Sequence, residues 1–145
     1  MSIFPTKILL ATDGSREAEL AARTAADLSH KTDSELHVLH VLALPLDTHD
    51  PSSFEPEILA PLETRAQRIL EDVVSKIEAS GGEVEGSHLT AGRPEAEIVT
   101  LAEQIGAGLI VMGSRGVGGI RRALMGSVAA SGLKHAHCPV LMVRE

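Results

Sequence analysis

The chain alternates short apolar runs with longer stretches in which apolar residues recur every three or four positions. Its first run, Ile8 to Ala11, ends at the polar turn Thr12-Asp13-Gly14-Ser15. An uninterrupted apolar run bounded by turn residues is typical of a strand buried on both faces of a parallel sheet. Ser15 is a suitable N-cap, so we expect the first helix to begin there and to reach about His30.

A second strand and a long helix follow. Glu35 to Leu44 predicts the strand, and residues 45–57, with three prolines, predict a loop. From Glu57 to Ser80 the apolar positions step by three and four, and Gly81-Gly82 ends the pattern. This spacing predicts a long helix with one buried stripe, made of Leu59, Leu62, Ala66, Ile69, Val73 and Ile77.

The remaining third of the chain continues the alternation. Val84 to Ala91 predicts a weak strand at a sheet edge, and Pro94 starts a third helix whose inward positions are Ile98, Leu101, Ala102 and Ile105. Gly108 to Met112 predicts a fourth strand, followed by a glycine-rich loop to Gly119. A helix over residues 120–135 and a last apolar strand, Pro139 to Val143, complete the pattern.

Strands that alternate with helices predict a doubly wound parallel sheet covered by helices on both faces, which is a three-layer α/β fold. We expect residues 1–145 to form one domain with five strands. A chain of this length buries enough surface to fold without disulfides or metals. Cys138 is the only cysteine, which excludes a disulfide within the chain.

Composition narrows the classes of partner. The formal net charge is −7, and the chain has two Phe but no Trp or Tyr. Binding to a nucleic acid requires clustered positive charge or aromatic platforms, so nucleic acid is not expected as a partner. The first apolar run is too short for a signal peptide or a membrane span, so we expect a cytoplasmic protein with no membrane partner.

Two connections carry candidate chemistry, because ligands of such sheets bind beyond the carboxyl ends of the strands, where the strand order reverses. One is Thr12-Asp13-Gly14, and the other is the segment GSRGVGGIRRALMGS that starts at Gly113. Its glycines permit positive φ and close approach of a ligand, and successive N–H groups can bind an anion. It is neither a Walker A loop nor the dinucleotide fingerprint. The residues alone leave two readings open, a phosphate site and a tight connection.

The spacing Gly113-x2-Gly116-x9-Gly126-Ser127 resembles the G-x2-G-x9-G-[S/T] signature of ATP-binding universal stress proteins. The resemblance extends to the opening KILLATDGS, to GRPEAEIVTLAEQIGAGLIVMGSRG and to CPVLMV near the end. It implies a Rossmann-like fold of the adenine-nucleotide α-hydrolase type, with strand order 3-2-1-4-5. It also implies a homodimer that forms through the strand Pro139 to Val143.

The resemblance further implies an ATP site, with Mg²⁺ as a companion of the phosphates. Asp13 would face the ribose or the phosphates, and backbone groups of Val41 would meet the adenine edge. Met112 and Gly113 would lie under the nucleoside. The other residues implied are Ala11 and Thr12 at the rim and Gly116, Gly126, Ser127 and Val128 around the phosphates.

The function expected on this basis is regulatory, in a stress response, with ATP as a ligand that sets the state of the protein. One alternative is an enzyme that uses the same site for slow ATP hydrolysis, autophosphorylation or substrate adenylation. A second alternative is an interaction module without nucleotide. No residue of the sequence identifies a catalyst.

Several residues also have plainer interpretations. Asp13 is a common turn residue, Ser127 is small enough to pack a helix, and Met112 fills core gaps. His135, His137 and Cys138 are poorly spaced for zinc, so a structural role is favoured. The remaining candidates are His37 and His40, expected to be framework residues, and Arg115, Arg121 and Arg122, which either steer phosphates or lie on a solvated helix face.

Overall fold

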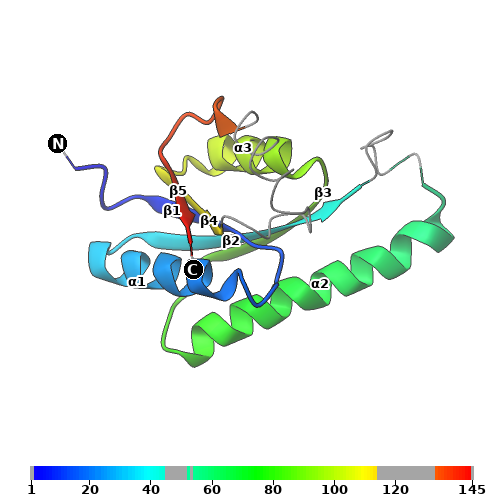
Figure 1. The fold of residues 1–145 in the computed structure, drawn as a ribbon, viewed down its shortest axis with the longest axis horizontal. Helices are drawn as coiled ribbons and strands as arrows, with labels where there is room; N and C mark the ends of the chain where they lie inside the picture. The colour runs from blue at the N-terminus through cyan, green and yellow to red at the C-terminus, as the bar shows by residue number, and fades with distance from the viewer. Residues whose placement is uncertain (1, 45–51, 53, 114–132, 145) are drawn as a thin grey trace.

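Five parallel strands form one sheet in the order β3-β2-β1-β4-β5 (Figure 1). The computed structural model describes residues 2–44, 52, 54–113 and 133–144. The strands are β1 (Lys7–Ala11), β2 (Glu35–Ala43), β3 (Gly86–Gly92), β4 (Leu109–Gly113) and β5 (Val140–Val143), and the helices are α1 (Glu19–Thr32), α2 (Pro56–Ala79) and α3 (Pro94–Ile105). The expected α/β fold, strand order and edge positions of β3 and β5 are confirmed.

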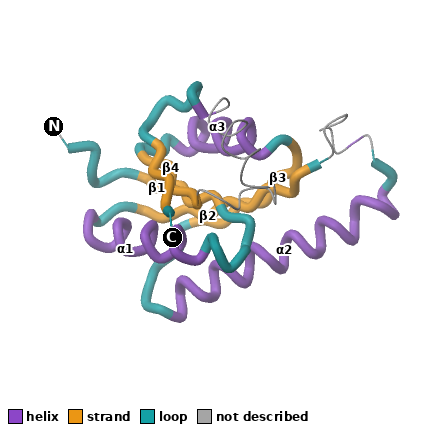
Figure 2. The backbone as a smooth tube through the Cα atoms, viewed as in Figure 1, coloured by secondary structure: helices purple, strands orange, loops and turns teal. Residues whose placement is uncertain are grey.

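Helices cover both faces of the sheet, with α1 and α2 on one side and α3 on the other (Figure 2). Strand residues alternate between these two layers. In β1, Ile8 and Leu10 pack with α1 and α2, whereas Leu9 and Ala11 pack with α3. All four side chains are at most 2% exposed. The apolar run therefore belongs to a strand buried on both faces, as its pattern predicts.

The first helix begins later than expected. α1 starts at Glu19, with Ala18 in the N-cap position, so the prediction of Ser15 as the N-cap is wrong. The hydroxyl of Ser15 instead accepts a hydrogen bond from Ala18 N–H at 3.2 Å. Ser15 thus caps a turn that carries the chain from the end of β1 to the helix.

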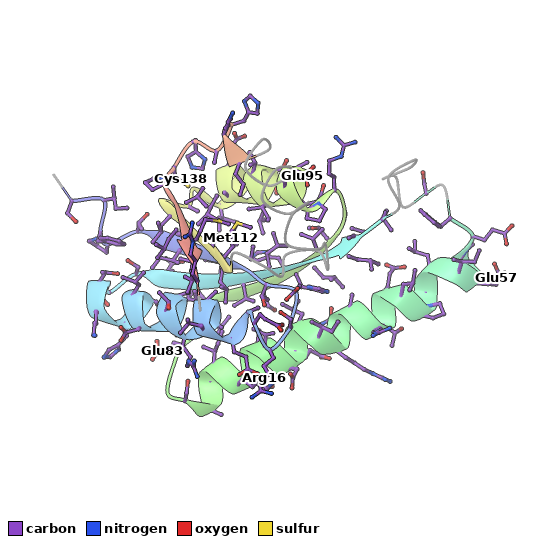
Figure 3. The ribbon with its side chains drawn as sticks, viewed as in Figure 1. Arg16, Glu57, Glu83, Glu95, Met112 and Cys138 are labelled. Carbon is purple, nitrogen blue, oxygen red and sulfur yellow. The ribbon has the colours of Figure 1, made fainter. Side chains whose placement is uncertain are left out.

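α2 is buried over only part of its length. Its buried residues are Ala66, Leu70, Val73 and Ile77, whereas Ile58 and Leu62 are 54% and 40% exposed. The first turns of α2 extend past the end of the sheet, where Figure 3 labels Glu57. The expected stripe is therefore correct near the sheet and wrong at Leu62, where no strand lies beneath the helix. Among the described helices, none has both the length and the apolar character needed to cross a membrane.

Candidate functional site

The strand order reverses between β1 and β4, which lie side by side at the centre of the sheet. Ala11 pairs with Met112 in the parallel register, so the carboxyl ends of the two strands coincide. The turn after β1 leaves the sheet at this edge, and β4 ends there at Gly113. This is the position at which parallel α/β sheets bind ligands.

The turn after β1 is held by a set of short hydrogen bonds. Thr12 N–H donates to Leu39 O at 2.9 Å, and Ser15 N–H donates to Asp13 Oδ1 at 2.8 Å. His40, only 6% exposed, lies 2.8 Å from Thr12 O through its Nδ1. Because a carbonyl oxygen only accepts, Nδ1 must carry the proton. His40 is therefore a framework residue, as expected, and it fixes the orientation of the turn.

The carboxylate of Asp13 has the plainer of its two expected roles, that of a turn residue. Its Oδ1 stabilises the turn through Ser15 N–H. Within the described part of the chain, Oδ2 has no hydrogen-bond partner. The turn thus orients the carboxylate, and contact of Asp13 with a ligand stays a prediction.

Gly14 belongs to the predicted connection Thr12-Asp13-Gly14, but sequence reasoning assigned it no role of its own. It has φ +75°, and a Cβ there would overlap the side chain of Ile69 on α2. Gly106 has a nearly identical φ of +72°, with nothing within 4 Å of an added Cβ. Alanine substitutions at these two glycines therefore distinguish the cost of backbone strain from the cost of steric overlap.

Gly14→Ala is expected to lower the free energy of unfolding by about 3 kcal/mol, since left-handed strain costs about 1 kcal/mol and overpacking about 2. Gly106→Ala, with strain alone, is expected to cost about 1 kcal/mol. Urea denaturation of both variants measures the difference. Equal losses would show that Ile69 moves aside without cost.

The backbone of Val41 lies beyond the end of β1. Leu39 O accepts a hydrogen bond from Thr12 N–H on the β1 side, whereas Leu44 N–H donates to Gly92 O on the β3 side. Neighbouring residues of a strand alternate between sides, so Val41 N–H and C=O face the β1 side. The last residue of β1 pairs with Leu39, two positions earlier. A peptide donor and acceptor therefore border the open end of β1.

A hydroxyl that sequence reasoning missed lies next to this position. Thr90 pairs with Val41 in the register of β2 and β3. Its Oγ1 is buried and has no hydrogen-bond partner within the described residues. Buried hydroxyls usually have a partner, so an unpaired one beside a candidate site is a useful marker.

Met112 and Gly113 end β4 at the same edge. Met112 is fully buried in the cluster that packs against α3, so its side chain is a core side chain (Figure 3). Gly113 does not use the positive φ that a glycine permits, because it is still part of a regular strand. An added Cβ would lie 3.8 Å from Ala18 Cα and 4.0 Å from Ala21 Cβ, which are ordinary contacts.

The predicted phosphate-binding residues Gly116, Gly126, Ser127 and Val128 lie outside the described residues, as do Arg115, Arg121 and Arg122. The structure therefore brings together Ala11, Thr12, Asp13, Val41, Met112 and Gly113 at one edge of the sheet. The phosphate loop stays a prediction.

His137 and Cys138 have structural surroundings near the end of the chain. His137 Nε2 lies 2.9 Å from Ala107 O, which it can only meet as a donor. Burial raises the pKa of the Cys138 thiol, which favours the protonated form. In the parts of the chain that the structure covers, no group of three or more His, Cys, Asp or Glu side chains is placed to hold a metal ion.

Comparison with known proteins matches residues 5–144 to the Universal stress protein family. Universal stress protein MJ0531 of Methanocaldococcus jannaschii is 35% identical over 140 residues, which cover 96% of this chain and 82% of that protein. The chain belongs to the universal stress protein family.

Two solved structures extend this likeness to the fold. Hypothetical protein MJ0577, the subject of a structure-based assignment of biochemical function, is 31% identical with a TM-score of 0.77, over 99% of this chain and 98% of that chain. A universal stress protein from Archaeoglobus fulgidus in complex with dAMP is 26% identical with a TM-score of 0.69, over 97% and 98% of the two chains. The fold of the family therefore covers nearly the whole chain.

Proposed function

We propose that this universal stress protein binds ATP at the carboxyl ends of β1 and β4 and acts as a regulatory protein in a stress response. The observation that carries the proposal is the backbone of Val41, whose N–H and C=O border the open end of β1, the strand that Asp13 follows. The relative from Archaeoglobus fulgidus that was solved with dAMP supports an adenine nucleotide as the ligand.

Each part of the nucleotide has a partner of fitting chemistry. Adenine presents an amino donor and a ring-nitrogen acceptor side by side, which complement one peptide C=O and one N–H at Val41. Guanine presents the opposite pattern on the same edge, so ATP should bind more tightly than GTP. Asp13 accepts hydrogen bonds from the ribose hydroxyls. Gly116, Gly126, Ser127 and Val128 bind the phosphates through main-chain N–H groups, with Mg²⁺ and its waters on the outer phosphate oxygens.

Calorimetry with Mg²⁺ and ATP, on protein freed of nucleotide, tests the proposal. We expect saturable binding that is weaker for GTP. Asp13→Asn keeps an oxygen for Ser15 N–H, so the turn remains while the charge is lost. We expect this variant to bind ATP roughly 10- to 100-fold more weakly, because a hydrogen bond to a charged group contributes about 1.5–3 kcal/mol. No binding by the folded wild type at millimolar ATP would refute the proposal.

Turnover separates the regulatory role from an enzyme. We propose that ATP sets the state of the protein in the cytoplasm, where this nucleotide is abundant, and that hydrolysis is at most slow. Bound nucleotide recovered from the purified protein as intact ATP agrees with that role. Rapid release of ADP, or of AMP with a co-substrate, would instead favour the enzyme.

We also propose a homodimer that forms through β5. This edge strand has two exposed apolar side chains, Leu141 at 37% and Met142 at 38%. An apolar edge strand is prone to pair with another chain, and a second copy can pair with it around a two-fold axis.

A further inference from the structure

Two histidines meet on the neighbouring strands β2 and β3, away from the carboxyl ends of β1 and β4. His37 Nδ1 on β2 lies 3.2 Å from His88 Nε2 on β3. Their ring centroids are 5.5 Å apart, and the ring planes differ by 29°. Both residues are half-buried, and the side chain of His37 is 12% exposed. The two nitrogens are hydrogen-bond partners in the metal-free protein, so one proton lies between them.

Glu35 sets the tautomer of a neutral His37 ring. Its Oε1 lies 3.3 Å from His37 Nε2, and a carboxylate only accepts hydrogen bonds. His37 therefore carries its proton on Nε2 and presents a lone pair at Nδ1. Burial, and then the neighbouring His37, lowers the pKa of His88, so the neutral imidazole is favoured there. A neutral imidazole is the form that binds metals.

Gly86 keeps the space in front of the two nitrogens open. It pairs with His37 in the register of the two strands. A Cβ added at Gly86 would lie 2.9 Å from His37 Nδ1 and 3.2 Å from His88 Nε2. Any other residue would therefore put a carbon atom next to both nitrogens at once.

We propose that His37 Nδ1 and His88 Nε2 form a binding site for a late transition-metal cation such as Zn²⁺, with water as the remaining ligands. Two nitrogens on one tetrahedral zinc ion, each at 2.0–2.1 Å, lie about 3.3 Å apart. The observed distance of 3.2 Å between His37 Nδ1 and His88 Nε2 therefore needs almost no change. His88 only has to move its proton from Nε2 to Nδ1 through solvent, which leaves the charge of the ring unchanged.

The surroundings agree with this assignment. Histidine ligands of zinc usually donate their second N–H to a carboxylate, which orients the ring and raises its basicity. The carboxylate of Glu35 is placed to accept this second N–H from His37 Nε2. Imidazole nitrogens favour zinc, copper and nickel, whereas Mg²⁺ and Ca²⁺ favour oxygen ligands. The histidine site therefore differs in metal preference from the place proposed for Mg²⁺ beside ATP. It also differs in position, because His37 pairs with Leu9, two residues before the end of β1.

Calorimetric titration of the tag-free, nucleotide-free full chain with ZnCl₂ tests the proposal. We expect one equivalent to bind in the micromolar range, with tighter binding of Cu²⁺ and none of Mg²⁺ at the same concentration. The EPR spectrum of the Cu²⁺ form should show coupling to nitrogen. His37→Asn and His88→Asn should each lose the site, and His30→Asn, which changes an exposed histidine, is the matched control.

Two further variants keep both histidines. Gly86→Ala should abolish Zn²⁺ binding while the thermal transition of the metal-free protein shows that it still folds. Glu35→Gln should weaken binding 10- to 100-fold, since outer carboxylates have effects of about this size. Unchanged Zn²⁺ binding by folded His88→Asn or Gly86→Ala would overturn the proposal, and so would the absence of saturable binding by the wild type. ATP binding is not expected to change in these variants, so the two proposals can fail separately.

Discussion

Gly126→Val is expected to abolish ATP binding while the protein still folds. Gly126 lies in the glycine signature, where main-chain N–H groups are expected to approach the phosphates directly. A branched side chain there would displace the phosphates from at least two N–H donors. Each such bond contributes about 1.5–3 kcal/mol, so the affinity should fall by roughly 100-fold or more. Calorimetry measures the affinity, and circular dichroism checks the fold.

Gly113→Ala is the matched control for this loss. Gly113 is the first glycine of the same signature, but an added Cβ would lie on the side of α1, at ordinary distances from Ala18 and Ala21. We therefore expect this variant to keep both its stability and most of its affinity for ATP. A folded Gly126→Val protein that binds as tightly as the wild type would show that the phosphates lie elsewhere.

Much of the fold could be predicted from the sequence because the strands of a parallel sheet are buried on both faces. Ile8 to Ala11 reads as an uninterrupted apolar run for this reason. The long helix shows the limit of such reasoning. Its apolar period continues through Leu62, yet Leu62 is 40% exposed because α2 extends past the sheet. Periodicity indicates which face of a helix is apolar but not where the core beneath it ends.

The candidate site was predictable where it depends on strand ends and not where it depends on register. Thr12 and Asp13 follow a strand directly, so their position at the edge of the sheet could be expected. The approach of His37 to His88 depends on how β2 and β3 align, across 51 positions of sequence. The start of α1 also differed from expectation, since a serine after a strand can cap a turn as well as a helix.

Among the described residues, the backbone groups of β5 that face away from β4 can be assigned one by one. Ile110 N–H donates to Pro139 O at 3.0 Å, so the backbone C=O of Pro139 points toward β4. The backbone groups of successive strand residues point alternately to the two sides of the strand. The N–H and C=O of Leu141 therefore also point toward β4, whereas those of Val140 and Met142 point away from the sheet. The backbone groups available to a second copy therefore belong to two residues.

Met142→Pro is accordingly expected to convert a dimer into a folded monomer. The substitution removes an outward N–H, and leaves the N–H groups that face β4 in place. Met142→Ala keeps the N–H and removes most of the side chain, so it should stay largely dimeric if backbone pairing dominates. Leu141→Pro should instead lower stability, because it removes an N–H that faces β4. Light scattering with the mass resolved at micromolar concentration distinguishes these cases. A monomeric wild type, or a folded Met142→Pro protein that remains a dimer, would exclude pairing through β5.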